Sequence, residues 1–138
     1  MAHNFHKIWI HFIWATKNRE PLLEKEIRKR LFVHMMEHSI EQNIFVDTIN
    51  GIEEHVHCLV SLQPSMSVSE AVNKLKGESS HWINSEKLIE GQFSWQDGYG
   101  AFSVSNHLVG QFRKYIRNQE EHHMQGSYLT DITEFLKR

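Results

Sequence analysis

Residues 53–62 read EEHVHCLVSL, and this stretch decides the fold because it has the pattern of a strand with two different faces. Alternate side chains of a strand point the same way, so one face of this segment is apolar and consists of Val56, Cys58, Val60 and Leu62. The imidazoles of His55 and His57 project together from the opposite face. The apolar face is expected to anchor this pair in the core.

The chain before this strand alternates between strand and helix patterns. Residues 7–15 (KIWIHFIWA) carry β-branched and aromatic side chains on both faces, which predicts a central strand or one buried on both sides. From Pro21 onward, an apolar residue recurs at every fourth position between charged ones, as in an amphipathic helix. A second strand is predicted over 44–49, and Asn50-Gly51 is a turn signal before the histidine strand.

The chain after the histidine strand continues the alternation. Ser67 and Glu70 have capping-box spacing at the start of a helix predicted over about 68–85. The segment 92–105 combines glycines with aromatic residues and ends in AFSV, which predicts a strand. The next helix is predicted from residue 105 or 106 to about 123, and a short helix over 129–137 is expected to dock back onto the domain.

The order β-α-β-β-α-β predicts an α+β fold of the ferredoxin-like type. This is a split β-α-β antiparallel sheet with helices on one face, here with a C-terminal helix that bears Tyr115. A chain of 138 residues without a linker is expected to form one domain over 1–138. No apolar run approaches the ~20 residues of a membrane span and no secretory leader is seen, so neither is expected. The single cysteine, Cys58, excludes an internal disulfide and fits the cytoplasm.

The formal charge of −2 argues mildly against a nucleic-acid partner, because proteins that bind phosphate backbones are commonly basic. Eleven histidines weaken that argument, since an imidazole titrates near pH ~6.5 and carries partial charge at neutrality. Local groups of basic residues therefore matter more than the total charge.

His55 and His57 are a candidate metal site, because imidazoles at alternate positions of a strand lie close enough to share an ion. The spacing alone proves little, since about one such pair is expected by chance in a chain of this composition. Two half-exposed strand histidines without a ligand are the alternative interpretation.

Tyr115 is the second candidate, on the helix predicted after residue 105. At about 100° per residue, Gln119 and His122 lie within roughly 40° of Tyr115 around that helix, so the three side chains project from one side. A tyrosine that packs its ring in the core and keeps its hydroxyl in water is the alternative.

Together these segments resemble the single-tyrosine HUH transposases, and within them the REP-associated tyrosine transposases and related insertion-sequence transposases. The similar segments are TKNREP at 16–21, EEHVHCLVSL at 53–62, LKGESS at 75–80, FSVS at 102–105 and YIRNQEEHH at 115–123. The resemblance implies a divalent metal bound by His55, His57 and Gln119, with Tyr115 as the nucleophile. His122 or His123 stays open as a substitute or additional ligand.

The resemblance also implies an enzyme, a DNA strand-transferase or endonuclease. Members of the family cleave single-stranded DNA near hairpins through a 5′-phosphotyrosine link, rejoin it without hydrolysis, and work as homodimers. A metal on the phosphate supplies alignment and charge stabilisation. Imidazoles alone would accept manganese, zinc or cobalt, whereas the family points to Mg²⁺ or Mn²⁺. Whether the tyrosine serves its own subunit's histidines or those of the other subunit stays open.

The candidate DNA contacts are basic residues near the proposed site or on the helix over 68–85: Lys17, Arg19, Lys74, Lys76, Arg113, Lys114 and Arg117. Each has the alternative of a solvated surface charge, and neighbouring glutamates partly cancel them. His34 and His38 also have the i, i+4 spacing of metal ligands on a helix. Exposed histidines are the simpler interpretation, and no role is assigned to them.

Two other functions remain open at this point. A nucleic-acid-binding module with the same fold would recognise hairpins or single strands without turnover. A zinc-dependent or histidine-rich structural protein would need zinc to fold and would not bind single strands. The order and spacing of the metal ligands, the tyrosine and the flanking segments favour the transposase.

Overall fold

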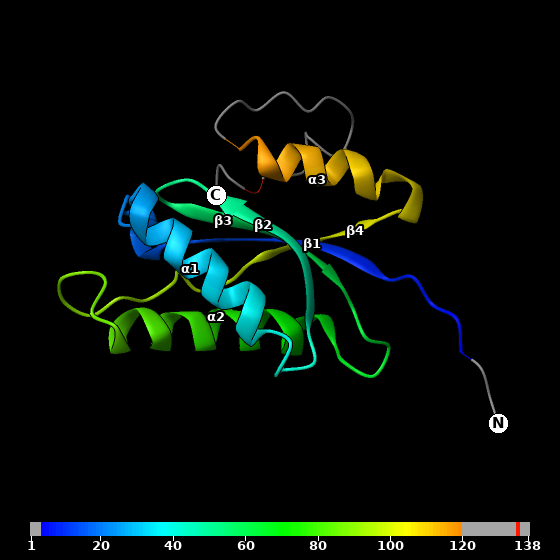
Figure 1. The fold of residues 1–138 in the computed structure, drawn as a ribbon, viewed down its shortest axis with the longest axis horizontal. Coiled ribbons are helices and arrows are strands. Elements are labelled where there is room, and N and C mark those ends of the chain that lie inside the picture. The colour runs from blue at the N-terminus through cyan, green and yellow to red at the C-terminus, as the bar shows by residue number, and fades with distance from the viewer. Residues whose placement is uncertain (1–3, 120–134, 136–138) are drawn as a thin grey trace.

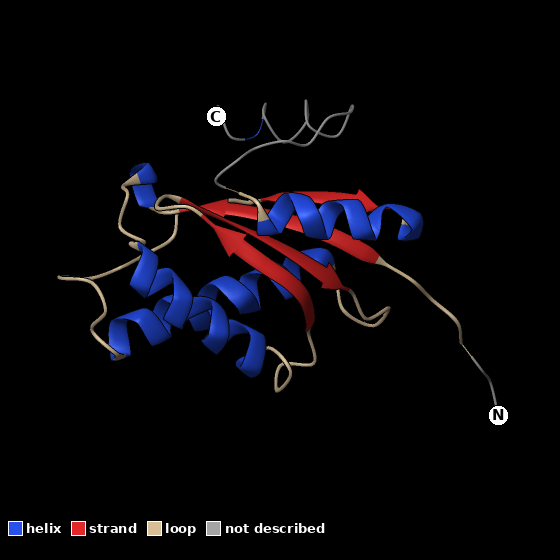
Figure 2. Cartoon of the chain, turned by 45° about the horizontal axis from the view of Figure 1, so that its top comes forward, coloured by secondary structure: helices blue, strands red, loops and turns tan. Residues whose placement is uncertain are grey.

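The described part of the chain, residues 4–119 and Phe135 of the computed structural model, folds around a four-stranded antiparallel sheet in the order β2-β3-β1-β4. The strands are β1 (Trp9–Ala15), β2 (Phe45–Gly51), β3 (His55–Ser61) and β4 (Gly100–Val104). Helices α1 (Lys25–His38) and α2 (Val68–Ser85) cover one face, and α3 (Val109–Arg117) lies on the other (Figure 1). Figure 2 shows the sheet between these two helical layers. The predicted α+β, ferredoxin-like fold with a separate tyrosine helix is confirmed.

β1 is central in the sheet because both of its faces are apolar. Ile10, Phe12 and Trp14 belong to the core between the sheet and the helices α1 and α2, whereas Ile13 belongs to the core under α3. Every residue of the strand after Trp9 is buried. A polar side chain placed on this strand is therefore buried as well, and His11 is fully so.

β3 follows the alternation seen in the sequence. Its residues Val56, Cys58 and Val60 join the core beneath α1 and α2, and Leu59 joins the core under α3. A side chain two positions from Leu59 shares its face. The histidines of β3 therefore face α3.

β2 pairs with β3 through a β-bulge between Val46 and Thr48. A bulge leaves one residue outside the ladder and re-aims its side chain. Here that residue is Asp47, whose carboxylate reaches Arg113 of α3, while Val46 stays in the core beneath α1 and α2. The bulge thus lets one edge strand contact both helical layers.

Two helix boundaries differ from the prediction. α1 begins at Lys25 rather than at Pro21, because the backbone N–H of Leu23 donates to the carbonyl oxygen of Glu53 (2.9 Å) and this keeps the preceding residues extended. α3 follows the 3₁₀ turn η2 (Asn106–Leu108) and ends at Arg117, so the prediction of one helix to about residue 123 was wrong. The backbone leaves the helix at Asn118, with φ −104° and ψ 38°.

The C-terminal helix predicted over 129–137 lies outside the described residues except for Phe135, and so do His122 and His123. Phe135 packs against the core under α3. The predicted cap of α2 is present, since the Ser67 hydroxyl accepts the N–H of Glu70 at 3.0 Å. Within 4–119, no helix combines the length and the apolar character that crossing a membrane requires.

Candidate active site

His55 and His57 lie next to each other on β3, on the face that α3 covers. Their ring centroids are 4.9 Å apart, and the rings are inclined by 68°. Both side chains are buried, with 3% and 0% exposure. An imidazole binds a metal ion in its neutral form.

A chain of polar contacts orients His55. Its Nδ1 lies 2.7 Å from the carboxylate of Glu54, and that carboxylate lies 3.4 Å from the guanidinium of Arg19 in the short turn η1 (Lys17–Arg19). An Nδ1–H that donates to a carboxylate leaves the lone pair on Nε2, which is the usual arrangement in a metal-binding histidine. The contacts therefore favour the tautomer of His55 that could hold an ion.

His11 is the member of this site that sequence reasoning missed. Its Nε2 lies 2.9 Å from Nδ1 of His57, and the two rings stack with centroids 5.1 Å apart. Burial lowers the pKa of His11 to about 3, so its imidazole is neutral at pH 7. The only sequence signal is a histidine in the middle of an otherwise apolar strand, residues 7–15.

Tyr115 of α3 packs its ring against those of His57 and His11. Its ring centroid is 5.6 Å from that of His57, at an interplanar angle of 82°, and 6.2 Å from that of His11. Burial raises the pKa of Tyr115, and a hydrogen bond with the Gln119 side chain lowers it only in part. The phenol is therefore neutral at pH 7, and a nucleophilic role needs positive charge close to the hydroxyl.

Gln119 lies one turn beyond Tyr115 and is fully buried. Its Nε2 donates to the backbone carbonyl oxygen of Tyr115 at 3.1 Å. Its Oε1 is buried and has no hydrogen-bond partner among the residues that the structure describes. A buried acceptor requires a partner, and an amide oxygen together with two imidazole nitrogens is a donor set that suits a divalent cation. The donor types of His55, His57 and Gln119 thus suit the implied metal, and their binding of it stays a prediction.

α3 is fastened to β2 by polar contacts as well as by its apolar face. Arg113 donates to both carboxylate oxygens of Asp47, at 2.7 and 2.8 Å. Asn50 donates its side-chain N–H to the carbonyl oxygen of Arg117 at 2.9 Å. These bonds fix α3 on β2, with the ring of Tyr115 beside that of His57.

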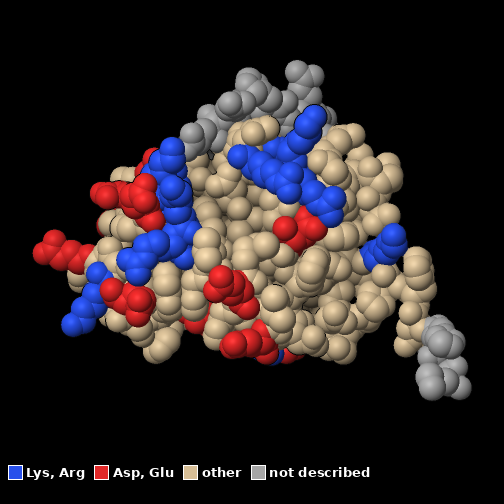
Figure 3. Space-filling model, in the orientation of Figure 1, with Lys and Arg blue, Asp and Glu red and all other residues tan. Residues whose placement is uncertain are grey.

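The basic residues proposed as DNA contacts fall on two sides of the sheet. Figure 3 shows Lys and Arg side chains gathered over α3, whose basic residues are Arg113, Lys114 and Arg117. Lys17 and Arg19 follow β1 directly, near His55, because Ala15 pairs with that residue. Lys74 and Lys76 lie on α2, on the far side of the sheet.

Several of these cations have partners within the chain. Lys76 donates to the carbonyl oxygens of Gln96 (2.9 Å) and Gly98 (2.8 Å), and burial lowers its pKa. Lys74 pairs with Glu70 at 3.2 Å, one helical turn away. Contact of these residues with DNA stays a prediction.

Comparisons with known proteins agree along nearly the whole described chain. The family model described as "Transposase IS200 like" matches residues 4–119. The ISDra2 transposase TnpA of Deinococcus radiodurans is 29% identical over 117 residues, which cover 80% of this chain and 83% of that protein. The transposase for insertion sequence element IS200 of Salmonella typhimurium is 25% identical over 136 residues, which cover 94% of this chain and 88% of that protein.

Solved structures share the fold. The crystal structure of a protein assigned as a transposase from Deinococcus radiodurans superposes with a TM-score of 0.68 at 26% identity, over 86% of this chain and 95% of that one. The structure of a REP-associated tyrosine transposase bound to a REP hairpin superposes with a TM-score of 0.59 at 16% identity, over 84% and 68%. Since the family model spans residues 4–119, this chain belongs to the IS200-like transposase family, whose members carry out DNA transposition.

Proposed function

We propose that this transposase cleaves and rejoins single-stranded DNA through a 5′-phosphotyrosine intermediate. Tyr115 is the nucleophile, and His55, His57 and Gln119 hold a divalent metal ion. The observation that carries the proposal is the position of the Tyr115 ring, 5.6 Å from the His57 ring, at a buried site with two imidazoles and an amide oxygen that lacks a partner among the described residues.

Mg²⁺ or Mn²⁺ bound there would neutralise charge on the scissile phosphate and on the leaving oxygen. The family resemblance favours these ions, and the amide oxygen of Gln119 suits them. The two imidazoles favour manganese over magnesium when both are supplied. Glu54 and His11 keep the two ligating imidazoles in fixed orientations through Nδ1 of His55 and of His57.

The reaction exchanges one phosphodiester for another. The Tyr115 oxygen attacks phosphorus, and the new O–P bond forms as the bond to the 3′ oxygen of the DNA breaks. The phenol gives up its proton and the departing 3′ oxygen takes one up, so the products are a 5′-phosphotyrosine and a free 3′ hydroxyl. Attack by a 3′ hydroxyl reverses the step.

The substrate we propose is DNA with a single-stranded or hairpin segment. A relative of the same fold is bound to a REP hairpin, which supports a hairpin for this chain too. We propose that Lys17 and Arg19, which follow β1, and Lys114 and Arg117 of α3 contact phosphates around the tyrosine. Such contacts position DNA and do not read its sequence.

We also propose a homodimer. β2 is an edge strand, and its exposed Phe45 (53%) lines one surface hollow together with the exposed Ile40 (72%), which follows α1. Neighbouring exposed apolar side chains of this size are typical of a surface that a partner covers. Because the free thiol of Cys58 fits a reducing compartment, we also propose that the protein acts in the cytoplasm.

The test is covalent capture. The protein is incubated with labelled single-stranded hairpin DNA and Mn²⁺ and run on a denaturing gel as the wild type, as Tyr115→Phe and as the control Tyr99→Phe. Tyr99 packs on Phe12 in the other core, so its variant should form the adduct. The proposal requires an adduct in the wild type and the control only, and its loss when the metal is chelated.

Hairpin binding without covalent capture would support the non-catalytic function instead. Hairpin binding that survives chelation and the Tyr115→Phe change, with no adduct in any metal, would make the chain a non-catalytic hairpin-binding module. Binding is read by gel shift on the same DNA, so both functions are decided on one set of samples.

A further inference from the structure

A second group of metal-ligating side chains lies on the side of the sheet away from Tyr115, between α1 and α2. Nε2 of His34 is 2.7 Å from one carboxylate oxygen of Glu78, and Nε2 of His38 is 3.7 Å from the other. The ligand atoms of these three residues all lie within 4.8 Å of one another. It is the one group of at least three histidine, cysteine or acidic side chains with this geometry within the part of the chain that the structure describes.

We propose that His34, His38 and Glu78 bind a zinc-class divalent transition metal that links α1 to α2. In a tetrahedral zinc site with bonds of about 2.0–2.1 Å, neighbouring ligand atoms lie roughly 3.3 Å apart. The two nitrogen–oxygen distances in the structure, 2.7 and 3.7 Å, bracket that value. One ligand atom from each residue can therefore approach a single ion, and water can complete the shell.

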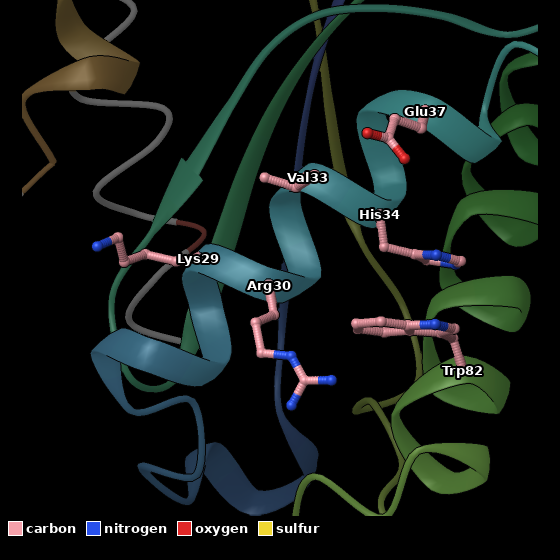
Figure 4. Close-up of a pocket in the computed structure, with 6 residues that line it drawn as sticks. All are labelled: Lys29, Arg30, Val33, His34, Glu37 and Trp82. Carbon is pink, nitrogen blue, oxygen red and sulfur yellow. The ribbon is translucent and has the colours of Figure 1, made fainter.

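The imidazole of His34 is already held in place. It stacks on the indole of Trp82, with the centroids 4.2 Å apart and the planes inclined by 7° (Figure 4). It also stacks on the ring of His38 at 5.3 Å. Two histidines spaced i, i+4 on a helix share one face, and Trp82 of α2 fixes the first of them against the facing helix. Less side-chain entropy is then lost when a metal binds.

The orientation of His38 favours the same nitrogen. Its Nδ1 lies 3.4 Å from the carboxylate of Glu41, one turn further along the chain. With Nδ1 on the side of Glu41, Nε2 is the nitrogen of His38 that faces Glu78.

Exposure and ligand type decide which ions fit. The side chains of His34, His38 and Glu78 are 19%, 34% and 20% exposed, so the site is open to ions and water. Two nitrogens and one carboxylate oxygen favour zinc, nickel, cobalt or copper over magnesium. An ion there would bind the folded state and stabilise the packing of α1 on α2 by mass action. This site is independent of the chemistry proposed at Tyr115.

The experiment titrates the full chain with Zn²⁺ in calorimetry and in thermal unfolding. It uses His57→Gln protein throughout, so that the proposed catalytic site contributes little. Added to this background, His38→Gln and Glu78→Gln each remove one ligand. His81→Gln is the matched control, because His81 is an exposed histidine that lies on α2, as Glu78 does, but outside the group. We expect the control to bind zinc as the background does and both ligand variants to bind it about tenfold or more weakly.

The unfolding temperature gives a second readout. Zinc should raise it in the background protein and in the His81→Gln control, and raise it less in the two ligand variants. Binding is measured below the unfolding temperature of each variant, so a loss of stability cannot imitate a loss of affinity. Unchanged zinc affinity and an unchanged temperature shift in both ligand variants would overturn the site and leave a hydrogen-bonded His-Glu cluster.

Discussion

His11 Nε2 lies 2.9 Å from His57 Nδ1 in the buried layer between the sheet and α3. Because His11 is neutral, a proton in this hydrogen bond sits either on His11 or on His57. If Nδ1 of His57 carries it, the lone pair of His57 is on Nε2 and can bind a metal. His11 then acts as an acceptor that selects the metal-binding tautomer of its neighbour, which makes it a positioning residue.

Replacing His11 should therefore weaken metal use. His11→Leu removes the acceptor, and we expect the manganese concentration for half-maximal adduct formation to rise about 10–100-fold, as is typical of an outer partner of a metal ligand. His11→Gln places an acceptor oxygen near the position of Nε2 and should recover part of the loss. The measurement is adduct yield against manganese concentration.

A purely structural role would give a different pattern. In that case both variants would lower the yield at every manganese concentration, and the half-maximal concentration would stay at the wild-type value. Recovery by glutamine together with a shifted metal requirement distinguishes positioning from packing.

The same burial makes stability depend on pH. The folded pKa of His11 is about 3, against an ordinary value of 6.5, so the unfolded chain binds a proton that the folded chain excludes. Stability from this group is fully present above pH 6.5 and is lost as pH falls towards 3, by about 1.4 kcal/mol per pH unit. Urea unfolding at pH 7 and pH 5 should show a drop of about 2 kcal/mol that His11→Leu reduces.

His81→Gln, a histidine replacement at an exposed position, is measured beside His11→Leu as the control. Asp47 does not interfere, because its pKa is already lowered from 3.8 and its contribution is lost only below that value. An equal drop in the wild type and in His11→Leu would contradict the assignment.

The alternation in residues 53–62 was enough to predict that His55 and His57 share a face, because side-chain direction on a strand depends only on position. His11 could not be predicted in the same way. It lies on a strand that looks apolar on both faces, and only the register between β1 and β3 brings it to His57, 46 positions away. Partners across a sheet depend on pairing, which no local pattern contains.

The contacts of charged side chains could not be predicted from the sequence either. Arg113 and Lys76 look like surface cations, yet one binds a carboxylate that a β-bulge turns towards α3 and the other binds two loop carbonyls. The end of α3 was predicted too late because the sequence around Asn118 lacks a proline or glycine that would stop a helix.

Gly51 is predicted to be essential for the position of His55. A Cβ at residue 51 would lie 2.3 Å from the backbone carbonyl oxygen of His55, so Gly51→Ala must displace the start of β3. We expect a loss of about 1–3 kcal/mol in unfolding free energy, typical of overpacking, and a lower adduct yield. Chemical denaturation and the adduct assay check both effects.

Gly77 is the matched control for that change. It lies in the middle of α2, and a Cβ there meets nothing within 4 Å. Gly77→Ala should stabilise the protein by about 0.5–1 kcal/mol, because glycine is a poor helix former. If both alanine variants changed stability in the same direction, the steric argument for Gly51 would be wrong.

The ion pair of Arg113 with Asp47 can be used to test whether Arg113 holds α3 on β2 or binds DNA phosphate. If it fastens α3 over the histidines, Asp47→Asn and Arg113→Gln should both lower the adduct yield. A double-mutant cycle on the unfolding free energy should give a coupling of only about 1 kcal/mol, because the Arg113 side chain is 39% exposed and solvent weakens the pair. If Arg113 instead binds phosphate, Asp47→Asn frees the guanidinium and removes a negative charge beside the DNA, so DNA binding should tighten. Asp47→Asn should therefore lower the adduct yield in the first case and tighten DNA binding in the second. Glu70→Gln, which frees Lys74 on α2, is the control for the loss of one acidic charge. The geometry favours fastening, since both carboxylate oxygens of Asp47 already accept from Arg113 at 2.7 and 2.8 Å.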